Sequence, residues 1–196
     1  LLEPEWRRKN AIPALRDLYD EIWVYGLEQL CDPLAGISVP KSVRQKMAYT
    51  GYLPRTAPLE MPRGASLAGT LTDEPYILVT TGGGGDGENL IDWVLRAYEY
   101  DHQLPYRALL VLGPFMAPEL QSAFLARAAK LKNVVAITFD AHLETLMARA
   151  AGVVAMGGYN TFCEILSFDQ RAIIVDRKST RLNSSHSQQS RMPSSA

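Results

Sequence analysis

The chain has few of the residues on which most active-site chemistry depends. Its 196 residues include two cysteines and three histidines. Cys31 and Cys163 are far apart in sequence and form no metal-binding or redox motif. The sequence contains no Ser–His–Asp, Cys–His or His-Glu-x-x-His constellation, and no Asp-x-Asp pair that would hold a metal against a diphosphate. We therefore expect a reduced, cytoplasmic protein with no metal and no cofactor.

The chain also lacks an excess of charge and a long hydrophobic run. Its formal net charge is −1, so the chain has no excess of positive charge with which to bind nucleic acid. No apolar run approaches the roughly 20 residues that span a bilayer, and no secretory signal opens the chain. Contact of the full-length protein with a membrane surface stays open. Hydrophobic residues make up 47% of the chain, which suffices for one domain with a sizeable core, or one plus a fragment.

The first 54 residues mix short elements with turn signals. The pattern predicts a helix over 6–18, a strand over 21–26 that ends in glycine, and a short helix over 41–47. Trp23, in the predicted strand, is expected in the core.

The segments on either side of the regular region are low in apolar periodicity. Residues 55–75 hold several Pro and Gly, which is typical of a linker; its Arg55 and Arg63 are candidates for phosphate contact. Residues 176–196 are Ser-rich, polar and aperiodic, which predicts a disordered, non-native tail. Since the chain does not begin with Met and its tail is predicted to be non-native, we expect it to be truncated at both ends.

Residues 76–175 alternate short apolar runs with helical patterns. Strands are predicted at 77–80, 108–112, 134–137, 153–156 and 172–175, and helices at 88–100, 118–131, 141–150 and 160–168. Strands that alternate with helices imply right-handed βαβ crossovers and a parallel sheet. The strands are apolar throughout, as expected when helices cover both faces. The predicted fold class is α/β, a Rossmann-like parallel sheet with helices on both faces.

Four consecutive glycines follow the first predicted strand and precede the first helix. Glycine allows the backbone to approach a ligand closely or to adopt a positive φ. The helix behind such a loop offers unpaired N–H groups and a partial positive charge, which suit a phosphate. Taken alone, the run could equally be a flexible surface turn. Asp86 is either a ligand contact or a plain turn residue, since Asp tolerates left-handed conformations.

A second glycine pair, Gly157-Gly158, repeats the order of strand, glycine and helix. Two such loops at the carboxyl ends of parallel strands can face one crevice, where open α/β sheets bind ligands. Together they predict a phosphorylated ligand. Thr161 and Glu164 also match a capping box, in which Thr caps the helix and Glu reaches back to its amide. Glu164 therefore has a structural interpretation beside the ligand-binding one.

Other polar and aromatic residues are interpreted structurally. Asp140 is expected to be a helix N-cap and His142 a surface residue in the first helical turn. Trp93, Leu95 and Tyr98 fall at helical spacings and are expected in the core or on the surface rather than against a ligand.

The chain resembles the C-terminal half of family 28 glycosyltransferases, which include the N-acetylglucosaminyltransferase of peptidoglycan lipid-intermediate synthesis. It resembles more closely a bacterial branch of predicted glycosyltransferases. The family carries a Gly-Gly-Ser-x-Gly-Ala loop, where this chain has residues 83–88, and a Ser/Arg-Gly-Ala-x-Thr-x-x-Glu loop, matched by residues 157–164. Its hinge, Thr-Gly-Asn-Pro-Val-Arg, resembles residues 50–55. The resemblance covers residues 17–175, and the Thr-x-x-Glu loop is its most specific element.

The resemblance implies a GT-B fold, in which two Rossmann-like domains face each other across a cleft. Residues 76–175 would be the domain that binds a nucleoside-diphosphate sugar, UDP-linked, for hexosyl transfer to an acceptor hydroxyl. Residues 1–54 would be a remnant of the acceptor domain, in which the general base lies, so no catalytic residue is assigned. Backbone N–H groups of both glycine loops would hold the diphosphate, Glu164 the ribose, and the turn at Phe139 the base. The candidate substrate-binding residues are Gly83, Gly84, Gly85, Asp86, Gly87, Phe139, Gly157, Gly158, Asn160, Thr161 and Glu164.

Departures from the family pattern leave the sugar and the acceptor open. Gly85 stands in place of the family's Ser, and Glu88 in place of its Ala; Met156 and Gly157 replace a basic or Ser residue. Two alternatives remain: a nucleotide-sugar 2-epimerase-like isomerase, and a non-catalytic Rossmann-like nucleotide-binding module. A dinucleotide site would require an acidic residue after the second strand, where Leu112-Gly113 stands.

Overall fold

The computed structural model describes residues 3–30, 32–57 and 74–175. The chain divides between Pro54 and Arg55 into two compact units. The predicted tail over 176–196, and the predicted linker apart from its ends, lie outside the described residues. Within the described ranges, no helix is long and apolar enough to cross a membrane.

The first unit contains three short helices and a two-stranded sheet. The helices are α1 (Glu3–Arg8), α2 (Ala11–Asp17) and α3 (Lys41–Gln45), and β1 (Ile22–Val24) pairs in parallel with β2 (Met47–Tyr49). The single helix predicted over 6–18 is wrong, because Asn10 adopts a left-handed φ of 52° and separates α1 from α2. The predicted core position of Trp23 is also wrong. Its side chain is 63% exposed, and its indole N–H donates to Glu21 Oε2 at 2.8 Å.

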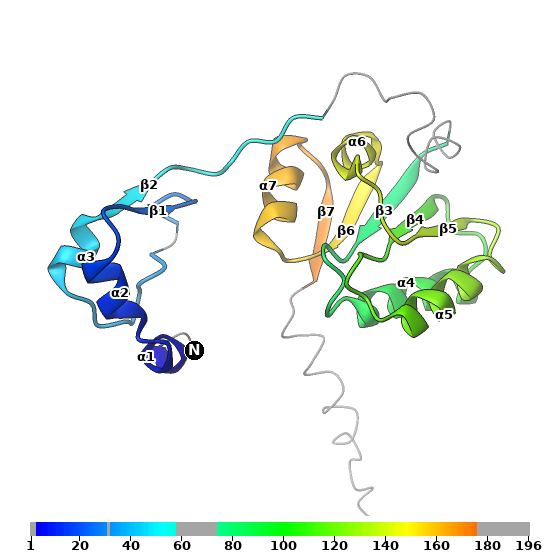
Figure 1. The fold of residues 1–196 in the computed structure, drawn as a ribbon. Coiled ribbons are helices and arrows are strands. Elements are labelled where there is room, and N and C mark those ends of the chain that lie inside the picture. The colour runs from blue at the N-terminus through cyan, green and yellow to red at the C-terminus, as the bar shows by residue number, and fades with distance from the viewer. Residues whose placement is uncertain (1–2, 31, 58–73, 176–196) are drawn as a thin grey trace, which may run out of the picture. The chain divides into compact units, whose positions relative to one another are not determined.

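The second unit is a five-stranded parallel sheet with helices on both faces. Its elements are β3 (Tyr76–Thr80), α4 (Glu88–Tyr100), β4 (Arg107–Val111), α5 (Pro118–Ala128), β5 (Val134–Ile137), α6 (Leu143–Arg149), β6 (Gly152–Met156), α7 (Tyr159–Ser167) and β7 (Ala172–Val175). The strand order is β5-β4-β3-β6-β7, and all neighbours are parallel. In Figure 1, α4 and α5 lie together on one face of the sheet, and α6 and α7 lie on the other. The predicted α/β, Rossmann-like fold class is confirmed.

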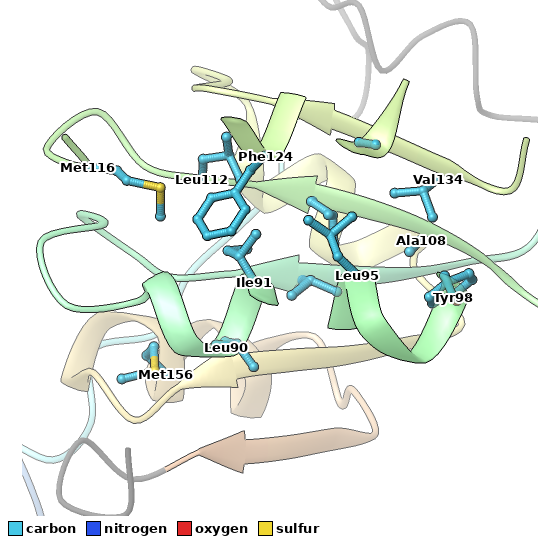
Figure 2. Packing of buried hydrophobic residues seen from close by; sticks show 13 residues of the cluster. Leu90, Ile91, Leu95, Tyr98, Ala108, Leu112, Met116, Phe124, Val134 and Met156 are labelled. Atoms are coloured by element: carbon cyan, nitrogen blue, oxygen red, sulfur yellow. The ribbon is translucent and has the colours of Figure 1, made fainter. Parts of the chain in front are cut away.

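Successive side chains of the central strands enter different cores. Leu78 of β3 belongs to a cluster with Leu146 and Met147 on the α6 side. The next residue, Val79, belongs to a second cluster with Leu95 and its neighbours on the α4 side. Figure 2 shows the buried side chains of α4 directed onto the sheet. Because both faces are covered, the central positions of these strands are apolar toward both faces instead of alternating with polar residues.

The last strand of the sheet differs from this pattern. β7 forms where a strand was predicted, but Ile173 is 66% exposed and Ile174 is 46% exposed. Among the described strands, β7 pairs with β6 alone. The expectation of a strand covered on both faces is therefore wrong for β7, because it lies at the edge of the described sheet.

The packing of α4 gives a direct test of the core. Leu95 is fully buried between α4 and the sheet, so Leu95→Ala removes methyl groups and leaves a cavity. We expect the free energy of unfolding to fall by about 2–5 kcal/mol. Tyr100 ends the same helix and is 93% exposed, so Tyr100→Ala should change the free energy of unfolding by less than about 0.5 kcal/mol. Urea denaturation measures the free energy of unfolding of both variants. Equal losses in the two would contradict the packing of α4 on the sheet through Leu95.

Candidate functional site

The two glycine loops leave neighbouring strands at the same edge of the sheet. β3 and β6 pair in parallel, with Thr80 opposite Ala155. Residues 81–87 lead from β3 to α4 on one face, and residues 157–158 lead from β6 to α7 on the other. The strand order reverses direction between these two strands, which makes their carboxyl ends the switch point where open α/β sheets bind ligands. The prediction that the two loops share one edge is confirmed.

The first loop is packed against the loop that follows β4, and glycine is required on both sides. Gly84 and Gly113 both have a φ of +88°. A Cβ added at Gly84 would lie 2.5 Å from the carbonyl oxygen of Leu112, and one at Gly113 would lie 2.7 Å from that of Gly82. The Thr81 hydroxyl donates to the Leu112 carbonyl at 2.6 Å. The glycine run is therefore a tightly packed backbone structure and not an open surface turn.

Other positions of the same loop stay open to a ligand. A Cβ added at Gly85 would meet nothing within 4 Å. The N–H groups of Gly83 and Gly85 have no hydrogen-bond partner among the described residues. Gly87 is the N-cap of the 13-residue α4, and no side chain caps this helix. Asp86 already has an interaction within the chain. The loop thus presents backbone donors and the positive end of a helix, the arrangement that suits an anion.

In the second loop, the glycine amides are already engaged. Gly157 N–H donates to Val175 O at 3.1 Å, and Gly158 N–H donates to Met156 O at 2.8 Å. Helix α7 begins directly afterwards at Tyr159, with Gly158 as its N-cap and no side-chain cap. The N–H groups of Asn160 and Thr161, in its first turn, have no partner among the described residues. The donors that this loop offers are therefore those of the helix start rather than those of the glycine pair.

Glu164 is a buried carboxyl on α7. Since α7 starts at Tyr159, Thr161 is inside the helix and does not cap it, so the capping-box interpretation is wrong. Glu164 is 9% exposed, with no hydrogen bond among the described residues. Burial raises the pKa of the Glu164 carboxyl, and the carboxylate of Glu144 on α6 raises this pKa further. The guanidinium of Arg55 opposes both effects and lowers it.

Arg55 lies along α7 beside this carboxyl. Its backbone N–H donates to Ser167 Oγ at 2.9 Å, and its Nη2 donates to Asn160 Oδ1 at 3.2 Å. Its Nε is buried and has no hydrogen-bond partner within residues 3–30, 32–57 and 74–175. The sequence placed Arg55 in the linker as a phosphate candidate; the structure attaches it to α7. Arg63, the other phosphate candidate in the linker, lies outside the described residues.

The loop after β5 presents an exposed aromatic ring at the same edge. Phe139 is 61% exposed, whereas the neighbouring Asp140 is buried. An Asp140 carboxylate oxygen accepts the backbone N–H of His142 at 2.7 Å. The N-cap of α6 is His142, so the expectation that Asp140 is the N-cap is wrong; it fixes the turn before the helix. The imidazole of His142 is 24% exposed, less than expected of a surface residue, and its Nδ1 lacks a hydrogen-bond partner in the described part of the chain.

A cavity of about 370 Å³ lies elsewhere in the second unit. Its lining residues are Tyr98, His102, Lys130, Leu131, Lys132 and Asn133. They stand near the carboxyl end of α4 and between α5 and the start of β5, at the opposite edge of the sheet from the glycine loops. The phosphate-binding candidate stays at the glycine loops, because their backbone N–H groups and the starts of α4 and α7 lie at the carboxyl edge of the parallel sheet.

Comparison with known proteins adds solved structures of similar fold. No protein-family model matches the chain, and no curated protein matches it. The glycotransferase of kitacinnamycin matches over 88% of this chain with 15% identity and a TM-score of 0.53. CalG4, the calicheamicin glycosyltransferase, matches over 89% with 15% identity and a TM-score of 0.49. The chain spans 41% of the first protein and 39% of the second. The likeness to the first shows the fold, a Rossmann-like parallel sheet with helices on both faces.

The packing of the two loops predicts opposite outcomes for neighbouring glycines. Gly84→Ala forces a side chain into a left-handed conformation and against the Leu112 carbonyl, so we expect a loss of about 1–3 kcal/mol in unfolding free energy. Gly85→Ala adds a methyl group in open space and should leave stability unchanged or raise it by up to about 1 kcal/mol. Thermal and urea unfolding measure both variants. Equal tolerance of both alanines would show that the loop is not packed as described.

The environment of Glu164 predicts a pH-dependent effect of its neutralisation. Because its pKa is raised in the folded chain, the stability it contributes is present at acid pH and is lost as pH rises through that pKa. Glu164→Gln stays neutral, so it should gain stability over the wild type at pH 8 and gain less at pH 4. Urea denaturation at both values measures the difference, with the exposed Glu119→Gln as control. A pH-independent effect would contradict the burial of an ionisable carboxyl.

Proposed function

We propose that this chain supplies the donor-binding half of a GT-B glycosyltransferase of the family 28 type. Its ligand is a nucleoside-diphosphate sugar, UDP-linked, and the reaction is hexosyl transfer to an acceptor hydroxyl. The observation that carries the proposal is the adjacency of β3 and β6, which brings two helix starts to one edge of the sheet. The fold likeness to a glycosyltransferase structure supports it.

In this proposal, the backbone of both loops binds the diphosphate. The unpaired N–H groups of Gly83 and Gly85 donate from one side, and those of Asn160 and Thr161 donate from the other. Helices α4 and α7 direct their positive ends to the same place, since each begins where its loop ends. Fixed dipoles of this kind neutralise charge without rearrangement.

The nucleoside lies on the α6–α7 side of the edge. The Glu164 carboxylate accepts hydrogen bonds from the ribose hydroxyls, and ribose thereby supplies the partners that this buried carboxyl lacks in the structure. The exposed ring of Phe139 lies against the base. Arg55, already attached to α7 at Asn160 and Ser167, keeps a positive charge beside the carboxylate.

The chemical step is the displacement of the nucleoside diphosphate at the anomeric carbon by an acceptor hydroxyl oxygen. The bond from the anomeric carbon to the diphosphate oxygen breaks, and the leaving diphosphate takes the electron pair. The role of this chain is to stabilise that developing charge with amides and helix dipoles. A general base and most acceptor contacts would come from the other domain, of which the first unit, up to Pro54, is a part. We expect nucleotide binding without turnover by this chain alone.

Calorimetry with UDP tests the proposal on the full chain. We expect UDP to bind, and UMP and ATP to bind more weakly, because the two loops would hold a diphosphate and the family resemblance implies a uracil base. Gly85→Val should abolish UDP binding, because its side chain fills the open space at the backbone donors. Its melting temperature should stay close to that of the wild type, since a Cβ there meets no atom within 4 Å.

The matched control for this variant is Ser122→Val, at an exposed position of α5. It introduces the same side chain and should leave UDP binding unchanged. A folded wild-type chain that binds no UDP would contradict the proposal. Equal binding by Gly85→Val and Ser122→Val would contradict the assignment of the diphosphate to the first loop.

A further inference from the structure

Phe115, in the loop between β4 and α5, is an exposed aromatic ring beside the first glycine loop. Its side chain is 78% exposed. A Cβ added at Gly83 would lie 3.1 Å from Cδ2 of this ring. The next residue, Met116, is 4% exposed and belongs to the core on the α4 side (Figure 2). The loop therefore buries one large side chain and presents the adjacent one at the carboxyl edge of the sheet.

The backbone that carries Phe115 is held firmly. Its N–H donates to Gly83 O at 2.8 Å, a bond between the two loops. Before it, Gly113 donates to Thr138 O at 2.9 Å, and its own carbonyl accepts from Gln121 Nε2 at 3.1 Å. Single exposed apolar residues are common on protein surfaces and by themselves mean little. Phe115 differs because hydrogen bonds of its own backbone N–H and of Gly113 hold its loop next to the proposed diphosphate donors.

The two faces of the sheet separate the loop of Phe115 from the residues proposed to bind the nucleoside. Glu164 and the loop after β5, which carries Phe139, belong to the helices α6 and α7 on one face of the sheet. Phe115 belongs to a loop that leads to α5 on the other face, beside the start of α4. With the nucleoside on the α6–α7 side and the diphosphate between the loops, the group that follows the diphosphate reaches the α4–α5 side. That group is the sugar.

We infer that the ring of Phe115 is a stacking surface for the sugar of the donor, an inference that rests on the proposed function. One face of a hexopyranose presents C–H groups, and the face of an aromatic ring is electron-rich, so the two surfaces attract each other. The ring contributes to neither core cluster, so it can be exchanged without loss of packing. Phe115 is thus a binding residue for the sugar and not for the nucleoside.

Calorimetry of the wild-type chain and of Phe115→Ala with UDP, UDP-glucose and UDP-N-acetylglucosamine tests this inference. We expect the wild type to bind at least one of the two sugar nucleotides more tightly than UDP. In Phe115→Ala, the affinity for that sugar nucleotide should fall about 3- to 10-fold, while the affinity for UDP stays the same. Phe115→Leu should lower the affinity for that sugar nucleotide by a similar factor, because leucine keeps an apolar side chain but lacks the ring. Melting temperatures of both variants should match the wild type.

The comparison variant is Phe139→Ala, on the nucleoside side of the edge, which should weaken UDP and the sugar nucleotides equally. Equal weakening of all three ligands by Phe115→Ala would contradict the inference and leave the proposed function intact. A wild type that binds UDP as tightly as both sugar nucleotides would likewise contradict the inference and leave the proposed function intact. A folded wild type that binds none of the three would contradict the proposed function, and with it the inference.

Discussion

The pairing of β3 with β4 on one side and β6 on the other is the constraint on which the site depends. Because β3 is central, its glycine loop lies between the loops that follow β4 and β6. The β4 side supplies packing, through contacts of Gly84 and Gly113 with backbone atoms. The β6 side supplies a second helix start. If β6 were paired elsewhere in the sheet, the same two sequences would form separate turns with no common ligand.

Within the first loop, the glycines serve two different purposes. At Gly84, the φ of +88° and the nearby Leu112 carbonyl leave no room for a side chain. The fold alone therefore explains why glycine stands there. Gly85 has neither constraint: no left-handed φ, and no atom within 4 Å of an added Cβ. A side chain there would cost the fold nothing, while its absence leaves the backbone donors accessible. Of these two adjacent glycines, Gly84 is thus required for folding, and Gly85 is proposed to be required for binding.

The sequence predicted the elements of the second unit well because each has a local signal. Helix α4 begins and ends where predicted, at Glu88 and Tyr100, between a glycine loop and Asp101. Where the outcome depends on distant residues, the prediction failed. The burial of Trp23 depends on a partner surface that a two-stranded sheet does not supply. The Thr-x-x-Glu spacing fits a helix start as well as a helix interior, and the start of α7 at Tyr159 decides for the interior.

The burial of the Glu164 carboxyl explains both why this residue destabilises the folded chain when ionised and why it is proposed to bind ribose. A carboxyl at 9% exposure, close to Glu144, is destabilising when ionised, as the raised pKa records. Arg55 offsets part of this effect, and the net pKa of Glu164 is still raised, so the compensation is incomplete. A ligand that offers hydroxyl donors to Glu164 would relieve the unpaired acceptor without bringing in another charge. A second anion at this point would add repulsion, so the charge of Glu164 favours a neutral ribose here and directs the diphosphate to the uncharged amides of the loops.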